Sequence, residues 1–196
     1  MNRRNSLALA YAVALALAAS SGPLCAHDTY KLWNGTQFVA DFGCPNTTTY
    51  GEVINVPANK HILANFTFSL QNYTDDSSMV ARAEVYAWNG TEATGSGLYE
   101  SAPFNISFAN SKFHKKVFAP AISVTPGTQY VLFLSIDKDF DQCQNNYKLA
   151  WGAVNEDRGS GNFVYQNNRG EYENWTTEAW SHYPPLDLAF EALLTQ

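Results

Sequence analysis

The strongest indication of the fold is one apolar stretch, Pro126-Gly127-Thr128-Gln129-Tyr130-Val131-Leu132-Phe133-Leu134-Ser135-Ile136. Pro126 suits the second position of a tight turn, and Gly127 permits the unusual backbone angles of the position after it. The residues that follow are too uniformly apolar for a half-exposed strand. They are also too few and too β-branched for a helix. We therefore predict a central strand that is buried on both faces.

The segments that precede this strand repeat with a period of two. Residues 65–70 alternate between polar and apolar side chains, which predicts a strand with one solvated face. Residues 79–88 also alternate, with Ala81, Ala83 and Val85 on one face and larger or charged side chains on the other. The last apolar run, at 187–194, is short and predicts a final strand rather than a helix.

About ten such short strands with almost no helical period predict an all-β fold, an antiparallel β-sandwich. We expect a jelly-roll-like arrangement. The alternative is a fibronectin- or immunoglobulin-like sandwich, for which this chain has too many strands.

Length and composition restrict the class of protein. A chain of 196 residues fits one domain with a sizeable core. The net charge is -6, from 12 Lys and Arg against 18 Asp and Glu, and no basic run follows the N-terminus. This balance argues against nucleic acid or an anionic membrane surface as the main partner.

The N-terminus has the three parts of a secretory signal peptide. Arg3 and Arg4 precede an apolar run at 7–19, and small residues follow. The run is too short for a membrane span of about 20 residues, so we expect no transmembrane segment in the mature chain. We predict a signal peptide at 1–26 and a single β-sandwich domain at 27–196, secreted to the extracellular space. Cleavage sites between 18 and 26 fit, and cleavage after Ala26 is favoured.

The three cysteines fit that export. Cys25 lies at the end of the signal peptide, which leaves Cys44 and Cys143. In an oxidising compartment such a pair predicts one disulfide, closing a loop of about 100 residues that contributes about 4 kcal/mol to stability. Two separate buried thiols are the alternative.

Seven Asn residues begin an Asn-x-Ser/Thr sequon, the acceptor sequence for N-glycosylation. They are Asn34, Asn46, Asn65, Asn72, Asn89, Asn105 and Asn174. Asn65 and Asn105 oppose apolar residues in alternating strands, which predicts that both face solvent. Their use depends on a host with the glycosylation machinery.

Aromatic side chains near loops suggest carbohydrate binding, because a sugar ring stacks on an aromatic face beside hydrogen-bonding groups. The candidates are Trp88, Trp175, Trp180 and Tyr183. The alternative is that these rings close the ends of the sandwich.

Two metal sites are considered. Asp137, Asp139 and Asp141 alternate as at the start of a calcium loop, but Gln142 and Lys148 stand where an EF-hand needs Gly and Glu. A looser structural calcium site and a solvated loop are the two interpretations. Separately, cleavage after Ala26 would expose the amino group and imidazole of His27.

That pair of nitrogens, with an imidazole from His61, His114 or His182, would suit copper. Such a site resembles that of lytic polysaccharide monooxygenases. No spacing in the sequence selects the second histidine. The alternative is an ordinary N-terminal residue.

The order of segments resembles a family of bacterial secreted β-sandwich domains often found ahead of a PEP-CTERM (exosortase-type) sorting tail. The matching stretches are Phe66-Thr67-Phe68, Val85-Tyr86-Ala87-Trp88-Asn89-Gly90, Leu98-Tyr99, residues 126–135, Asn162-Phe163-Val164-Tyr165 and Asp187-Leu188-Ala189-Phe190. The resemblance implies the fold and brings no catalytic residues. No Pro-Glu-Pro motif occurs, so we expect a freely secreted product.

No motif specifies a reaction: nucleophile elbows, zinc-protease helices and phosphate loops do not occur in the sequence. We therefore predict a non-enzymatic extracellular module with a binding or matrix role and a glycan as its ligand. A copper-dependent oxidative enzyme using His27 is the alternative.

Overall fold

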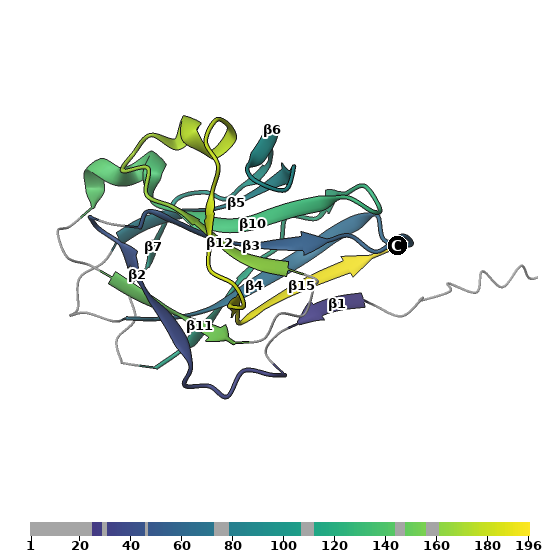
Figure 1. Cartoon of the computed structure of the whole chain (residues 1–196), viewed down its shortest axis with the longest axis horizontal. Coiled ribbons are helices and arrows are strands. Elements are labelled where there is room, and N and C mark those ends of the chain that lie inside the picture. Colours follow the sequence, from purple (N-terminus) through teal and green to yellow (C-terminus); the bar gives the residue numbers. More distant parts are fainter. Residues whose placement is uncertain are drawn as a thin grey trace, which may run out of the picture.

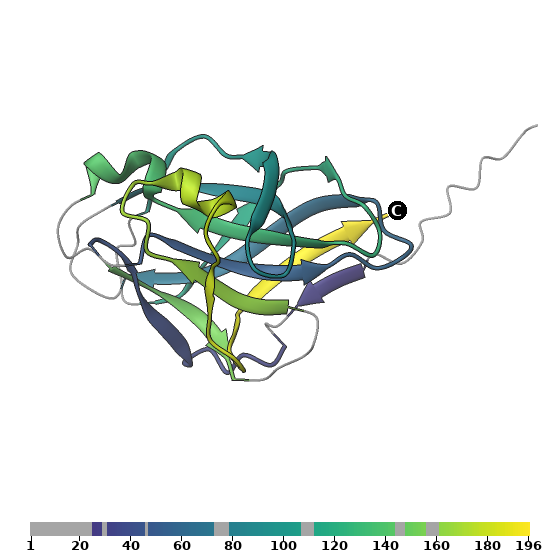
Figure 2. The same ribbon diagram turned by 45° about the horizontal axis from the view of Figure 1, so that its top comes forward.

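The computed structural model describes residues 25–28, 31–45, 47–72, 79–106, 112–143, 148–155 and 161–196, with the backbone alone at 25–28 and 161. All pairs of neighbouring strands in this part of the chain are antiparallel. The strands form two sheets that pack face to face (Figures 1 and 2). The predicted β-sandwich is confirmed, and its strands outnumber those of a seven-stranded immunoglobulin-like domain.

The first sheet has eight strands, with β4 paired on both sides. They are β1 (Cys25–Asp28), β2 (Phe38–Gly43), β4 (Ile62–Asn72), β8 (His114–Phe118), β9 (Ile122–Ser123), β11 (Lys148–Val154), β14 (Asp187–Leu188) and β15 (Phe190–Thr195).

The second sheet has seven strands in the order β13-β12-β3-β10-β5-β6, with β7 also paired to β5. They are β3 (Thr49–Asn55), β5 (Met79–Trp88), β6 (Ala93–Glu100), β7 (Phe104–Ile106), β10 (Gln129–Ser135), β12 (Gly161–Gln166) and β13 (Ser181–His182). Two short 3-10 helices, η1 (Asp137–Gln142) and η2 (Tyr172–Thr176), complete the described elements.

Strand β10 is buried on both faces, as predicted. It pairs with β3 along one side and β5 along the other. Leu132 and Leu134 point into the core between the sheets, whereas Val131 and Phe133 join a second apolar cluster on the outer face. All four side chains are fully buried. The turn before β10 also forms as expected, with Gly127 at φ 75° and the Thr128 amide donating to the Thr125 carbonyl at 3.3 Å.

The predicted solvated face of residues 65–70 is only partly right. Thr67 and Ser69 are 4% and 2% exposed. Strand β4 lies in the middle of its sheet, so neighbouring strands on both sides shield its short Ser69 and Thr67, which pair in register with Lys115 and Val117 of β8. The alternating pattern therefore identified the strand and its core face but overestimated the exposure of the other face.

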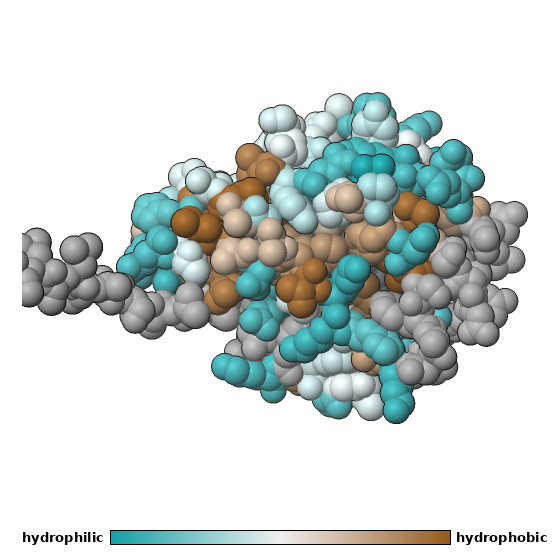
Figure 3. Space-filling view, turned by 180° about the vertical axis from the view of Figure 1, so that it is seen from behind, coloured by the Kyte–Doolittle hydropathy of each residue, from teal (hydrophilic) through white to brown (hydrophobic). Residues whose placement is uncertain are grey.

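The outer surface retains some apolar character. Seen from the side opposite to Figure 1, apolar residues gather in a band between hydrophilic margins (Figure 3). Ile62, Leu98 and Val117 are the large aliphatic side chains with substantial exposure among the described residues. In the described ranges, no helix is long and apolar enough to cross a membrane.

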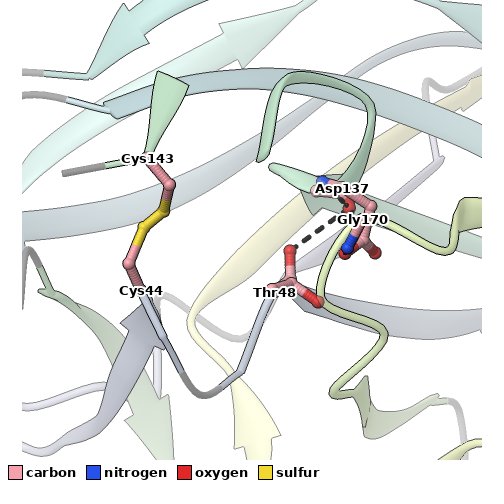
Figure 4. Close-up of a disulfide and its surroundings, with 6 residues drawn as sticks. Cys44, Thr48, Asp137, Cys143 and Gly170 are labelled. Carbon is pink, nitrogen blue, oxygen red and sulfur yellow. Dashed lines mark hydrogen bonds between the residues drawn. A yellow bond between two sulfur atoms is a disulfide. The ribbon is translucent and has the colours of Figure 1, made fainter. Parts of the chain in front are cut away.

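The predicted disulfide is confirmed. Cys44, just after β2, is bonded to Cys143, just after η1, with Cα atoms 6.1 Å apart (Figure 4). The two cysteines lie 99 positions apart in the sequence, and their bond ties the β2–β3 connection to the end of η1. Two separate thiols are thereby excluded.

Removing this disulfide is expected to reduce the free energy of unfolding by about 4 kcal/mol, because the unfolded chain regains loop entropy. Urea unfolding of a Cys44→Ser, Cys143→Ser double variant measures the loss. An unchanged unfolding midpoint would show that the cross-link does not contribute to stability.

A carboxyl group is buried in the core between the sheets. Glu52 of β3 is fully buried, and its Oε2 accepts a hydrogen bond from the Leu188 amide at 3.0 Å, while Oε1 has no partner within the described part. Burial raises the pKa of Glu52 well above its ordinary value, and the nearby Asp187 raises it further. Between pH 4.5 and this raised pKa, the folded state therefore holds a proton on Glu52 that the unfolded chain has released.

This proton predicts a characteristic pH dependence. Above pH 4.5 an unfolded Glu is ionised, so the free energy of unfolding should fall as the pH rises towards the raised pKa of the folded state. Glu52→Gln keeps the acceptor for Leu188 and removes the titration. It should stabilise the protein at neutral pH and change little near pH 4.5. Glu173→Gln, at an exposed position, is the matched control. Equal destabilisation of Glu52→Gln at both pH values would contradict this assignment.

Candidate functional site

The segment 166–183, here called the cover, starts at the end of β12, crosses the outer face of the second sheet and ends at β13. Trp175 of η2 and Trp180 pack edge-on against Phe133 of β10, with ring centroids 5.0 and 5.2 Å away. The Trp180 Nε1 donates to the Trp175 carbonyl at 2.9 Å, and the Trp180 amide donates to the Thr91 carbonyl at 2.8 Å. Figure 2 shows η2 lying over β10. This cover is what buries the second face of β10.

The cover is anchored by the carboxylate of Asp137, which is 3% exposed. Its Oδ2 accepts hydrogen bonds from the Thr49 hydroxyl at 2.8 Å, the Ser135 hydroxyl at 3.0 Å and the Trp175 Nε1 at 3.1 Å. Its Oδ1 accepts from the Gly170 amide at 3.0 Å. Figure 4 places Asp137, Thr48 and Gly170 beside the disulfide. The carboxylate thus joins β3, β10, η1 and the cover.

The suggested calcium site is therefore corrected. Asp137 faces N–H and O–H donors, which a cation would not share, and Asp139 accepts from the Arg82 Nε at 2.8 Å. Asp141 is exposed. No three His, Cys, Asp or Glu side chains gather as metal ligands among the described residues.

The copper hypothesis stays a prediction. His27 pairs with Ala192 in β1, but its side chain lies outside the described part of the chain. His61 precedes β4 and His114 begins β8, both in the first sheet, whereas His182 lies on β13 of the second.

The predicted carbohydrate-binding role is also wrong for two of the tryptophans. Trp175 and Trp180 are 1% and 5% exposed, because their rings cover Phe133, so neither offers a free ring face to a ligand. The alternative, that these rings close the fold, applies to this pair. Trp88 is half-buried and Tyr183 is 63% exposed, and these two line separate grooves.

An ionic network ties η1 to the sheet beside the cover. The Lys138 Nζ lies 3.0 Å from Oε1 of Glu84 and 2.7 Å from Oε2 of Glu100, and Arg82 pairs with Glu100 at 2.7 Å. Burial raises the pKa of Glu84 to about 7, although Lys138 opposes the shift. Partial burial also acts to raise the pKa of Glu100, but Lys138 and Arg82 bring it below its ordinary value.

Two carboxyl groups with separated pKa values are typical of acid–base pairs in enzymes. However, the Glu84 side chain is 1% exposed and cannot reach a substrate. The network therefore holds η1 against β5 and β6.

The first groove, here called the Tyr183 groove, opens between β2 and β12 and has a volume of about 490 Å³. Its walls include Phe38, Asp41, Tyr50, Phe163, Tyr165 and Tyr183. Tyr183 is 63% and Phe38 46% exposed, so both rings are open to solvent. Tyr50 and Phe163 form the buried floor, with ring centroids 4.8 Å apart.

A β-bulge sets the position of Asp41 at this groove. Val39 faces Trp151 and Phe42 faces Leu149, so two residues of β2 oppose Ala150 alone. Asp41 takes φ 75°, a left-handed angle that Asp tolerates better than most residues. Its Oδ1 accepts from the Lys148 Nζ at 2.8 Å, and 52% of its side chain is exposed. The lining of the groove therefore combines aromatic rings with one carboxylate, which Lys148 neutralises.

Tyr183 was a sequence candidate, whereas Phe38, Asp41 and Tyr165 were not. No local pattern marks the bulge, since Phe38-Val39-Ala40-Asp41 reads as an ordinary start of a strand. The non-consecutive pairing of the strands brings these positions together.

The sequons differ in access. Asn34, Asn89 and Asn105 are exposed, Asn65 and Asn174 are half-buried, and Asn46 lies outside the described residues. Asn72 is only 8% exposed, so this sequon is buried in the folded chain. Asn34 and Asn89 form matching turns in which the amide oxygen accepts from the backbone and hydroxyl of the sequon Thr.

Comparison with known protein families finds no match, and neither does comparison with curated proteins. Among solved structures, the chain is similar to the clostridial cysteine protease Cwp84 after propeptide cleavage, with 11% identity and a TM-score of 0.53. The similarity covers 83% of this chain and 38% of that one.

A structure of the cysteine protease and lectin-like domains of Cwp84, a surface layer associated protein of Clostridium difficile, gives 10% identity and a TM-score of 0.48. It covers 77% of this chain and 32% of that one. At these identities the likeness concerns the fold alone, and this chain spans well under half the length of each of those proteins.

The structural role of Trp175 can be tested by removing its N–H group. Trp175→Phe should reduce the free energy of unfolding by roughly 1.5–3 kcal/mol, because a buried carboxylate loses one donor. Trp88→Phe, at a half-buried ring, is the matched control and should cost less. Chemical denaturation measures both, and equal losses would contradict the anchoring role.

Proposed function

We propose that the protein is an extracellular carbohydrate-binding module and that the Tyr183 groove holds a neutral saccharide. The observation that carries this proposal is that the exposed ring of Tyr183 and the carboxylate of Asp41 line the same groove. The predicted signal peptide and the disulfide support an oxidising, extracellular location.

The groove suits a sugar by shape and chemistry. The apolar C–H face of a sugar ring would stack on Tyr183, and Phe38 offers a second exposed ring in the same groove. Sugar hydroxyls would donate to the Asp41 carboxylate and accept from the Lys148 ammonium. A volume of about 490 Å³ lies in the range of small-molecule sites.

Charge selects the class of ligand. Asp41 is the charged residue among those that line the groove, and Lys148 neutralises it at 2.8 Å. A cation would compete with Lys148 for the carboxylate, and an anion would meet the carboxylate itself. A neutral saccharide neither competes with Lys148 nor is repelled by the carboxylate.

A glycan-array screen of the wild-type protein, followed by calorimetry on the best saccharide, tests the proposal. Tyr183→Ala should weaken binding about tenfold, the equivalent of 1.4 kcal/mol. Asp41→Asn should also weaken it, because the change removes the negative charge and one acceptor oxygen, while Asn tolerates the same left-handed backbone.

Tyr172→Ala is the matched control, since Tyr172 is 40% exposed and lies away from the groove. It should bind as the wild type does. A wild-type protein that binds no saccharide would refute the proposal, and so would equal losses from Tyr172→Ala and Tyr183→Ala.

A further inference from the structure

A second groove lies on the outer face of the second sheet, at the end of the cover. This Trp88 groove has a volume of about 450 Å³, and its walls include Trp88, Thr91, Asn162, Val164, Trp180 and His182. Trp88 meets Trp180 edge to face, with ring centroids 5.6 Å apart. Thr91, Asn162 and His182 are exposed. The groove combines an aromatic wall with hydrogen-bonding groups and has no carboxylate, Lys or Arg in its lining.

The two grooves lie on opposite faces of one ribbon, which consists of β12 and the adjoining segment at β13. Along β12, Asn162 and Val164 line the Trp88 groove, whereas Phe163 and Tyr165 line the Tyr183 groove. Successive side chains of a strand point to opposite faces, so this alternation follows from the extended backbone. The next segment repeats it, with His182 in the Trp88 groove and Tyr183 in the Tyr183 groove.

The ribbon ends at an exposed edge. β13 pairs with β12 through Val164–His182 and Tyr165–Ser181 and is the last strand of its sheet. Residues 181–185 are all exposed. Pro184 and Pro185 lack backbone N–H groups, which discourages pairing with a further strand. The edge between the grooves is therefore open to a ligand.

We propose that both grooves hold one linear neutral saccharide chain, which crosses the edge at β13. This inference rests on the proposed carbohydrate binding and adds that the ligand is recognised as a chain rather than as a single terminal sugar. The matching chemistry of the two grooves supports it, since each offers an aromatic wall and neutral or neutralised polar groups.

Joint occupation has a measurable consequence. Once one end of a chain is bound, the other end meets its groove at high local concentration, which can raise affinity by about 10²-fold or more. Affinity should therefore rise steeply when the chain becomes long enough to span the edge, and then level off.

Calorimetry with linear glucan, mannan and chitin oligosaccharides, from the monosaccharide to long chains, tests this on the full mature protein. Asn162→Ala, at an exposed position, and Trp88→Ala should each weaken long-chain binding about tenfold or more and leave the monosaccharide affinity of the Tyr183 groove unchanged. Tyr183→Ala should weaken both. Thermal unfolding of each variant confirms that the fold is intact, and Asn162→Ala serves if Trp88→Ala does not fold.

The possible outcomes separate the two proposals. If long chains bind no more tightly than monosaccharides, or if Asn162→Ala binds long chains as the wild type does, the chain inference is overturned while the Tyr183 groove stands. If the wild type binds none of these saccharides and none on the glycan array, both proposals fail.

Discussion

The carboxylate of Asp137 is the point on which the outer half of the molecule depends. It lies directly after the central strand and accepts hydrogen bonds from β3, from the end of β10, from the turn at Gly170 and from Trp175. A buried carboxylate is stable only when donors surround it, so these contacts fix one another. The disulfide at Cys143 then closes the same end of the sandwich.

This anchoring explains why β10 is apolar on both faces. One face packs against the opposite sheet, and the other packs against a cover that Asp137 holds in place. The cover ends at β13, whose edge separates the two grooves. The binding surface that we propose is thus a consequence of how the outer face is closed.

The alternation of side chains and the Pro126-Gly127 turn were sufficient to predict the sandwich and its central strand, because both are local signals. The disulfide followed from cysteine parity. The burial of Trp175 and Trp180 was not predictable, since an aromatic ring near a loop has the same composition whether it binds a ligand or covers a strand. Asp41 was missed because its bulge depends on pairing with β11, far along the chain. The hydrogen-bonding role of Asp137 was not predictable, because its donors come from distant segments.

Hydrogen exchange on the wild type and on Asp137→Asn tests most directly whether this carboxylate holds the cover. Amides in 166–183 should lose protection in the variant, while those of β4 and β15 should keep theirs. Protection that stays unchanged in 166–183, or that falls equally in both sheets, would contradict it.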